Sequence, residues 1–196
     1  TQPIVLLEGV FAAEQLLEAA RYGFDLVVHD ALQIEILEEG PGPYRFVLWV
    51  KIDTGMNRLG FRPGEFPAAL ARLRKLEPAP LEIRLLTHLA RADEPDSPMT
   101  AEQVARFQEA IRGLDYPISI ANSAGVFSEL HLGCDWVRPG LALYGASPFA
   151  DRTGADLGLR PVMSLETSVI AVRHVPRGET VGYGGTWQAR RDSKVA

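Results

Sequence analysis

Cysteine is almost absent from this 196-residue chain, in which Cys134 is the only one. A single cysteine excludes an internal disulfide bond, and no cysteine–histidine spacing typical of a zinc site is present. Basic residues are not in excess either, because 20 lysines and arginines stand against 25 aspartates and glutamates, a net charge of −5. That balance disfavours nucleic-acid binding, which needs a basic surface. We therefore expect neither a metal site nor a nucleic-acid partner.

Long apolar runs and targeting signals are also lacking. No run is long enough to cross a membrane as a helix, and the first residues, Thr1-Gln2-Pro3-Ile4, have no signal-peptide pattern. The sequence has no phosphate-binding Walker loop, no G-x-G-x-x-G after a strand, no G-x-S-x-G and no H-E-x-x-H. We expect a cytoplasmic protein without a membrane partner and without a paired-carboxylate site.

Apolar runs alternate with amphipathic stretches along the first part of the chain. Buried strands are expected at 4–7, 24–29, 45–52, 81–88, 117–120 and 135–137. Helices are expected at 12–21, 31–38, 63–76, 100–113 and 124–130, and Thr100 with Gln103 has the spacing of a capping box. Such an alternation predicts a parallel sheet with right-handed crossovers.

The number of units favours an α/β fold of the (β/α)8 barrel type. Six strands are expected where a closed barrel needs eight, so we interpret residues 1–150 as a partial barrel whose first strands are missing. An open doubly wound sheet is the alternative. Residues 161–175 are rich in Val, Ser, Thr and Ile and lack a helical period, which is typical of strands. Residues 151–196 are therefore expected to begin an all-β domain, in a chain truncated at both ends.

The segment 51–61 is the first candidate site, because it follows an apolar strand. Its pattern is Lys-x-Asp-Thr-Gly-Met-x-Arg-x-Gly, placed where a parallel strand ends, and α/β proteins bind ligands at that edge. Lys51 and Arg58 bring two cations near one point, which suits an anionic or phenolic ligand atom. A solvated loop with a tight turn at Gly55 explains the same pattern equally well.

Further candidates lie where strands end or where glycines expose a side chain. They are His88 after the fourth strand, Asn122 and Ser123 before a helix, Arg138 with Gly140 and Leu141 after the sixth strand, and Tyr183 between glycines. Free backbone N–H groups, a guanidinium or a phenol at these positions could serve an anionic ligand or cofactor. A strand-end hydrogen bond, a helix cap, a surface arginine or a hairpin aromatic explains each feature taken alone.

Five stretches, in their order along the chain, resemble the alanine racemases, which are pyridoxal-phosphate (PLP) enzymes. The matching stretches are 51–61, 87–94, 121–124, 135–140 with 143–145, and 181–187. The resemblance covers essentially the whole chain and implies a PLP-binding barrel followed by a β domain. It also implies the interconversion of L- and D-alanine, which supplies D-alanine for peptidoglycan or L-alanine for catabolism.

The resemblance implies cofactor contacts for the residues at the strand ends. Arg138 would hydrogen-bond the pyridine nitrogen of PLP, which leaves that nitrogen largely unprotonated and weakens the ring as an electron sink. His88 would lie against the ring. Ser123, with the backbone of Gly140 and Leu141, would hold the phosphate, and Asn122 would also belong to the cofactor-binding residues.

Three more residues would act around the substrate. Arg58 would contact the phenolic oxygen of PLP and the substrate carboxylate, and Lys51, which the family often carbamylates, would position Arg58. Tyr183 would be one of two opposed acid/base groups and would exchange the α-proton of L-alanine. In the family this tyrosine reaches the PLP site of the other subunit, so the resemblance implies a head-to-tail homodimer.

The family's second acid/base group, the lysine that forms the Schiff base with PLP, has no counterpart in the chain. The lysines present are Lys51, Lys75 and Lys194, and none lies in the matching context. We therefore expect the 196 residues alone to be inactive and the longer protein to racemise alanine. The alternatives are a barrel enzyme of the D-threonine aldolase or D-serine dehydratase type, a non-catalytic PLP-binding protein, and an inert fragment.

Overall fold

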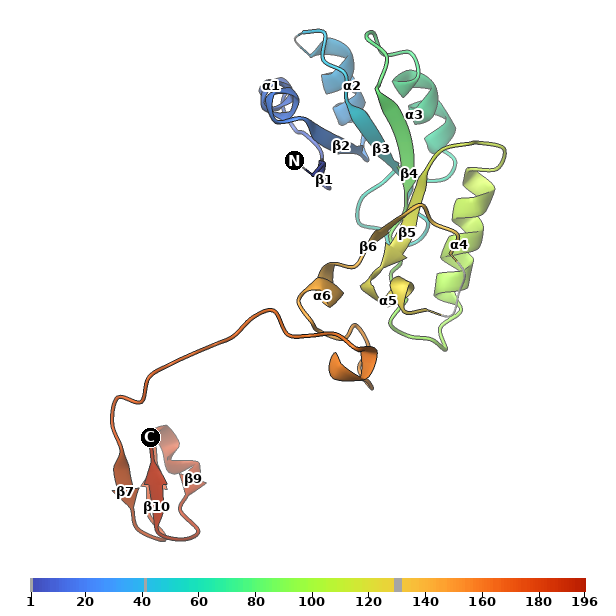
Figure 1. Ribbon diagram of the computed structural model, residues 1–196. Coiled ribbons are helices and arrows are strands. Elements are labelled where there is room, and N and C mark those ends of the chain that lie inside the picture. Colours follow the sequence, from blue (N-terminus) through green and yellow to red (C-terminus); the bar gives the residue numbers. More distant parts are fainter. Residues whose placement is uncertain (1, 41, 129–131) are drawn as a thin grey trace. The chain divides into compact units, whose positions relative to one another are not determined.

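The computed structural model describes residues 2–40, 42–128 and 132–196, and the chain divides into two compact units. The first unit runs from Thr1 to Val162 and the second from Met163 to Ala196. Within the described residues, the first unit holds one parallel sheet in which the strands follow the order of the sequence (Figure 1). The strands are β1 (Ile4–Leu6), β2 (Phe24–Val28), β3 (Val47–Lys51), β4 (Glu82–Leu86), β5 (Ile118–Asn122) and β6 (Trp136–Arg138).

The longer helices connect the strands and lie along one side of the sheet in Figure 1, whereas the short ones follow β5 and β6. They are α1 (Ala13–Tyr22), α2 (Ala31–Glu39), α3 (Phe66–Leu73), α4 (Met99–Ala110), and the short α5 (Ser123–Val126), α6 (Gly140–Leu143) and η1 (Ala155–Leu157). The chain winds in a single direction, whereas a doubly wound sheet would reverse its strand order. The predicted partial barrel is confirmed, and the doubly wound alternative is wrong.

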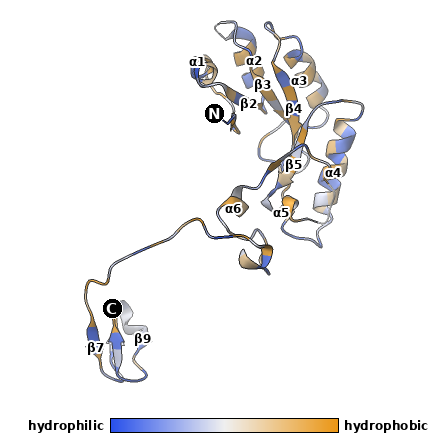
Figure 2. Cartoon of the chain, in the orientation of Figure 1, coloured by the Kyte–Doolittle hydropathy of each residue, from blue (hydrophilic) through white to orange (hydrophobic). Residues whose placement is uncertain are grey.

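The main hydrophobic core lies between the helices and the face of the sheet that they cover. Leu48, Val50 and Leu85 from the strands pack in one buried cluster with Phe66 and Phe107 from helices α3 and α4. In Figure 2, β3 and β4 are mainly hydrophobic, whereas α4 carries both hydrophobic and hydrophilic residues. Because side chains of a strand alternate between its two faces, this packing leaves the other face of the sheet for the barrel interior.

The interior face of the sheet carries charged and aromatic side chains along the strands. Arg84 from β4 lies over two indole rings, with its guanidinium carbon 5.1 Å from the ring centre of Trp49 and 4.6 Å from that of Trp136. Asp25 from β2 accepts a hydrogen bond from the indole nitrogen of Trp49 (3.2 Å) and lies 3.6 Å from Arg84. Cation–π and ionic contacts therefore fill this part of the interior.

Two predictions about the helices are wrong. Helix α4 begins at Met99 after Pro98, because the fixed φ of proline suits the start of a helix. Thr100 is thus not the cap but lies inside α4, where its Oγ1 is buried and has no hydrogen-bond partner among the described residues. The helix expected at 124–130 is limited to Ser123–Val126, and residues 129 and 130 lie outside the described part of the chain.

The second unit consists of short antiparallel strands. β7 (Arg173–Val175) pairs with β10 (Ser193–Val195), and β8 (Thr180–Val181) pairs with β9 (Trp187–Gln188) across the 3-10 turn η2 (Tyr183–Gly185). The expected all-β character is confirmed. The strand character expected over 161–175 is limited to the last three residues, because the residues before them are exposed and have no strand partner in the described chain.

None of the helices in the described residues is both long enough and apolar enough to cross a membrane.

A closed loop follows β3 and carries the first candidate segment. The backbone N–H of Asp53 donates to the carbonyl of Phe61 (2.8 Å), and the N–H of Phe61 donates to the carbonyl of Lys51 (2.9 Å). The Oδ1 of Asp53 also accepts hydrogen bonds from the N–H groups of Gly55 and Asn57, both at 3.0 Å. Gly60 has a φ of 125°, and a β-carbon there would lie 2.8 Å from the nitrogen of Asp53. The loop is therefore pinned against the end of the strand.

We expect Gly60→Ala to lower the free energy of unfolding by about 2–4 kcal/mol, because it combines backbone strain at positive φ with a clash against backbone atoms. The matched control is Gly64→Ala, since an added β-carbon at Gly64 meets no atom within 4 Å and its φ lies outside the positive range. Urea unfolding of the full-length protein measures both changes. Equal free energies of unfolding of the two variants would contradict the close approach of Gly60 to the backbone at the end of β3.

Candidate functional site

The candidate residues of the first unit meet at the carboxyl edge of the parallel sheet. Lys51 is the last residue of β3, Asn122 the last of β5 and Arg138 the last of β6, while His88 follows β4 by two residues. Parallel pairing of β3 with β4, β4 with β5 and β5 with β6 brings these ends side by side. Neighbouring strands thus carry side chains that are far apart in the sequence to one edge.

Arg138 is the most firmly held of these side chains. Its Nη1 donates to the hydroxyl of Ser119 on β5, and its Nη2 donates to the carbonyl of Thr87 at 2.5 Å. Among the described residues, no hydrogen bond reaches its Nε. Burial lowers the pKa of Arg138 to about 10, so the guanidinium keeps its charge at neutral pH. Two of its five N–H donors are used in these contacts, so the Nε–H of a fixed cation remains available to a ligand.

Lys51 is an unusual amine because only 7% of its surface is exposed. Burial lowers its pKa, the charges of Arg58 and Arg138 lower it further, and Asp53 partly opposes them. A lowered pKa raises the fraction of the neutral, nucleophilic amine. The exposed Arg58 lies in the pinned loop after β3, close enough to act on both Lys51 and His88.

His88 is held neutral by its surroundings. Burial lowers the pKa of its imidazole to about 4, and the charges of Arg138, Arg58 and Lys51 act in the same direction. The ring therefore carries no charge at neutral pH. A flat uncharged ring among cations offers a packing surface for an anionic aromatic ligand.

The residues after β5 and β6 form a small polar corner. The Oδ1 of Asn122 caps α5 by accepting from the N–H of Gly125 (2.9 Å), as the structural alternative proposed. The hydroxyl of Ser123 accepts a hydrogen bond from the N–H of Ala142 (3.1 Å), which joins α5 to α6. Gly140 and Leu141 are exposed at the start of α6, and a β-carbon on Gly140 would meet no atom within 4 Å. Open space beside backbone groups suits a bulky polar ligand group.

Tyr183 lies in the second unit, at the start of η2. Its side chain is fully exposed, and the flanking Gly182 and Gly184 have φ values of 77° and 72°. β8 ends before these glycines, at Val181. The glycines leave both faces of the phenol open, as expected.

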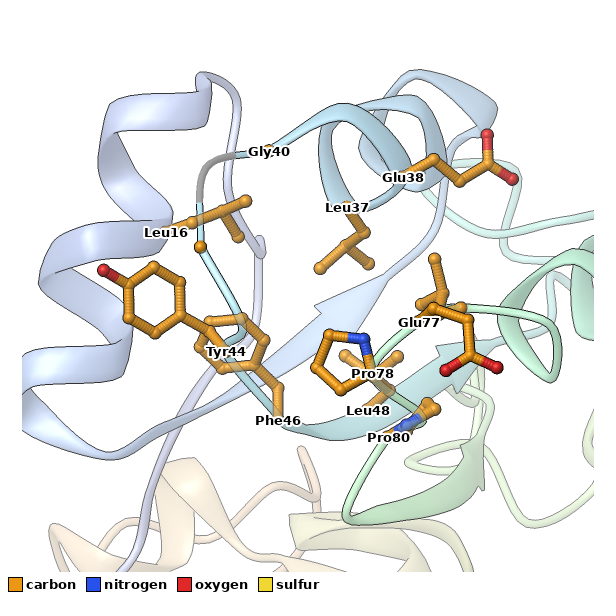
Figure 3. Close-up of a pocket in the computed structure, with 12 residues that line it drawn as sticks. Leu16, Leu37, Glu38, Gly40, Tyr44, Phe46, Leu48, Glu77, Pro78 and Pro80 are labelled. Atoms are coloured by element: carbon orange, nitrogen blue, oxygen red, sulfur yellow. The ribbon is translucent and has the colours of Figure 1, made fainter.

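The first unit contains a small cavity far from the candidate residues and a larger one beside the loop after β3. A cavity of about 40 Å³ lies at the amino ends of the strands, between Leu16, Phe46 and Pro78 (Figure 3). It is on the opposite edge of the sheet and too small for a cofactor. A cavity of about 600 Å³ borders the loop after β3, where Asn57, Arg62 and Arg106 contribute to its lining.

The polar residues that support the site were not among the candidates predicted from the sequence. Thr54, Thr87, Gln103 and Ser119 are all buried and hydrogen-bonded next to the candidate residues. Thr87 and Ser119 interrupt apolar strand runs, and a polar residue at a buried strand position is a usable signal, because it needs a partner. Gln103 gave no such signal, since its spacing from Thr100 fitted a helix cap.

The neutral state of His88 predicts a pH dependence of stability. An unfolded histidine titrates near 6.5, whereas the folded pKa of His88 is about 4. Between these values the unfolded chain binds a proton that the folded protein does not, so the free energy of unfolding falls as the pH drops from about 6.5 toward about 4. We expect a smaller fall in His88→Gln, measured by urea unfolding of the full-length protein. Equal falls in the free energy of unfolding of the two proteins would contradict a half-buried, neutral ring.

Comparison with known proteins agrees with the geometry. The model of the alanine racemase N-terminal domain matches residues 1–148, and that of the alanine racemase C-terminal domain matches residues 162–196. Alanine racemase from Aeromonas hydrophila is 44% identical over 194 residues, which are 99% of this chain and 54% of that protein. Biosynthetic alanine racemase from Escherichia coli K12 is 44% identical over all 196 residues and 55% of its own length.

Solved structures show the same similarity. The chain superposes on biosynthetic alanine racemase from Pseudomonas aeruginosa with a TM-score of 0.88 and 41% identity, over 99% of this chain and 54% of that one. Alanine racemase from Bartonella henselae with covalently bound pyridoxal phosphate gives a TM-score of 0.75 and 28% identity, over 97% of this chain and 53% of that one. The chain thus spans about half the length of the relatives it matches. It belongs to the alanine racemase family.

Proposed function

We propose that this chain is part of a PLP-dependent enzyme that interconverts L- and D-alanine in the cytoplasm as a head-to-tail homodimer. The observation that carries the proposal is the meeting of Arg138, His88, Lys51 and Arg58 at one edge of the sheet. Such a cluster of cations with a neutral ring suits a flat anionic cofactor. Family membership makes PLP and alanine the specific choice.

The charges and hydrogen bonds of the site support PLP. Bound PLP supplies an electron sink that makes the α-proton of an amino acid acidic. Arg138 offers its Nε to the pyridine nitrogen, and with a pKa of about 10 it keeps its proton rather than transferring it. The ring nitrogen therefore stays largely unprotonated, which restrains side reactions. His88 packs as a neutral surface against the ring.

The phosphate of PLP is assigned to the polar corner after β5 and β6. Ser123 supplies a hydroxyl that already accepts from Ala142 and is free to donate. Gly140 and Leu141 supply backbone N–H groups beside open space. Asn122 acts by capping α5 and so holds Ser123 in place.

Lys51 and Arg58 are assigned to the phenolic oxygen of PLP and the substrate carboxylate. The lowered pKa of Lys51 favours the neutral amine, whose nitrogen can attack carbon dioxide to form a carbamate with release of a proton. The carbamate would replace a cation by an anion next to Arg58, which relieves the repulsion and orients the guanidinium. Arg58 then faces the anionic groups of cofactor and substrate.

Tyr183 is assigned to proton transfer at the α-carbon of L-alanine. A phenol has a pKa near 10 in water, so it needs cations beside it to act as a base near neutral pH. Its full exposure in the second unit supports a role in a site completed by another subunit. The cations of that subunit's barrel edge would supply the electrostatic environment.

The 196 residues alone are proposed to lack activity. Lys51 is engaged at the barrel edge, while Lys75 follows α3 and Lys194 lies in β10 of the second unit. The lysine that would attach PLP covalently and act on the other face of the α-carbon is therefore assigned to the longer protein. The product serves either D-alanine supply for peptidoglycan or L-alanine catabolism.

We expect the full-length protein to convert L-alanine to D-alanine, and Tyr183→Phe to lower kcat by about 10²–10⁴-fold, because it removes a positioned acid/base group. The visible absorbance of bound PLP should stay unchanged in this variant. Tyr22→Phe is the matched control, since Tyr22 is also exposed but lies on α1. Equal loss in both variants, or cleavage of D-threonine in place of racemisation, would contradict the proposal.

The head-to-tail arrangement predicts complementation between two inactive variants. A dimer of one Tyr183→Phe subunit and one Arg138→Ala subunit contains one site with both native residues. Random exchange makes half of the dimers mixed, so we expect recovery of about a quarter of the wild-type activity. Each variant alone should stay inactive, and a mixture without recovery would argue for sites built from one subunit.

A further inference from the structure

Gln103 occupies an unusual place for a long polar side chain. It lies on α4, on the helix side of the sheet, and has no exposed surface. Its Oε1 accepts from the N–H of Ala90 (2.8 Å), and its Nε2 donates to the carbonyl of His88 (3.0 Å) and to the Oγ1 of Thr54 (3.3 Å). One carboxamide therefore joins the loop after β4 to the loop after β3.

The hydrogen bonds continue from Gln103 to the cationic side of the site. The hydroxyls of Thr54 and Thr87 lie 2.8 Å apart, and both residues are buried. The carbonyl of Thr87 accepts from Nη2 of Arg138, whose Nη1 donates to Ser119. This chain of contacts runs from α4 across the ends of β3 and β4 to β5 and β6.

Arg106, about one turn further along α4, makes a second contact with the loop after β3. Nη1 of Arg106 donates to the carbonyl of Thr54 at 2.9 Å, and its Nη2 pairs with Glu102. The loop residue Thr54 is thus held by α4 at both its side chain and its backbone. Because buried polar groups need their partners, the loss of one of these contacts would leave a buried group without a hydrogen bond.

We infer that Gln103 is a positioning residue that fixes His88, Arg138 and the loop of Arg58 as one unit for binding the flat cofactor, although α4 itself lies outside the barrel. The inference rests on the proposed function for its catalytic consequence. The restraint on the positions of these residues does not depend on the proposed function, because the hydrogen bonds join them with or without a ligand. The group that His88 faces consists of Arg138, Arg58 and Lys51.

The test compares Gln103→Leu with Gln108→Leu in the full-length protein. Both replace glutamine on α4, but Gln108 is exposed. We expect Gln103→Leu to weaken PLP binding about 10–100-fold, as loss of a supporting contact commonly does, and to lower kcat while KM for alanine stays within about threefold. Gln108→Leu should match the wild type in each measurement.

A readout without PLP separates the two proposals. The imidazole resonance of His88, assigned by its loss in His88→Gln, is titrated in the apoprotein. In Gln103→Leu the ring is free to move away from Arg138 and into solvent, so its pKa should rise from about 4 toward about 6.5. If the wild type neither binds PLP nor racemises alanine, the proposed function fails while this titration still decides the role of Gln103.

Thr54→Val keeps the inference testable if Gln103→Leu does not fold. Valine has nearly the shape of threonine but removes the hydroxyl that links Gln103 to Thr87, and the same weakening of PLP binding and rise in the pKa of His88 are expected. A folded variant at either position with PLP affinity and His88 titration like the wild type would overturn the inference.

Discussion

The parallel direction of the strands is the constraint on which the rest of the first unit depends. Right-handed crossovers return every strand in the same sense, so the carboxyl ends of β3 to β6 meet at one edge. Residues that are more than 80 positions apart in the sequence, such as Lys51 and Arg138, thereby act on each other electrostatically. The apolar face packed against the helices stabilises this arrangement, while the other face and the strand ends remain for chemistry.

Crowding of positive charge is the main property of that edge. Burial lowers the pKa values of Lys51 and His88, and the charges of Arg58 and Arg138 lower both further. Such a cluster is costly in the absence of anions. A phosphate, a phenolic oxygen, a carboxylate or a carbamate would each relieve it, so one set of residues suits both the cofactor and the amino-acid substrate of the proposed function.

Helix α4 shows that residues outside the barrel can control the geometry inside it. Its apolar face buries Phe107 against the sheet, and in the same helix Gln103 and Arg106 reach the loops that carry the site. The burial of Phe107 and the hydrogen bonds of Gln103 and Arg106 are coupled, since a shift of the helix would break both. The helix therefore links the stability of the fold to the placement of His88 and Thr54.

Much of the fold and of the site can be predicted from local pattern. Apolar strand runs and helical spacing placed the strands and helices close to their observed positions, because burial on one face dictates that pattern. The segment after β3, His88, Ser123, Arg138 and Tyr183 were recognised by their position after strands or between glycines and by their order along the chain. These features depend on neighbours in the sequence, or on a resemblance that spans the chain.

The sequence by itself determined the alternation of elements and the residues at the strand ends, because both are encoded by short-range spacing. It also determined the family, because five ordered stretches resemble it. Only the tertiary structure decided what Gln103 does, since its partners lie 13 to 49 residues away, and the local pattern with Thr100 pointed to a cap instead. The same holds for the neutral state of His88 and the fixed guanidinium of Arg138. Burial and charge depend on which side chains the fold brings together, and no window of sequence contains that information.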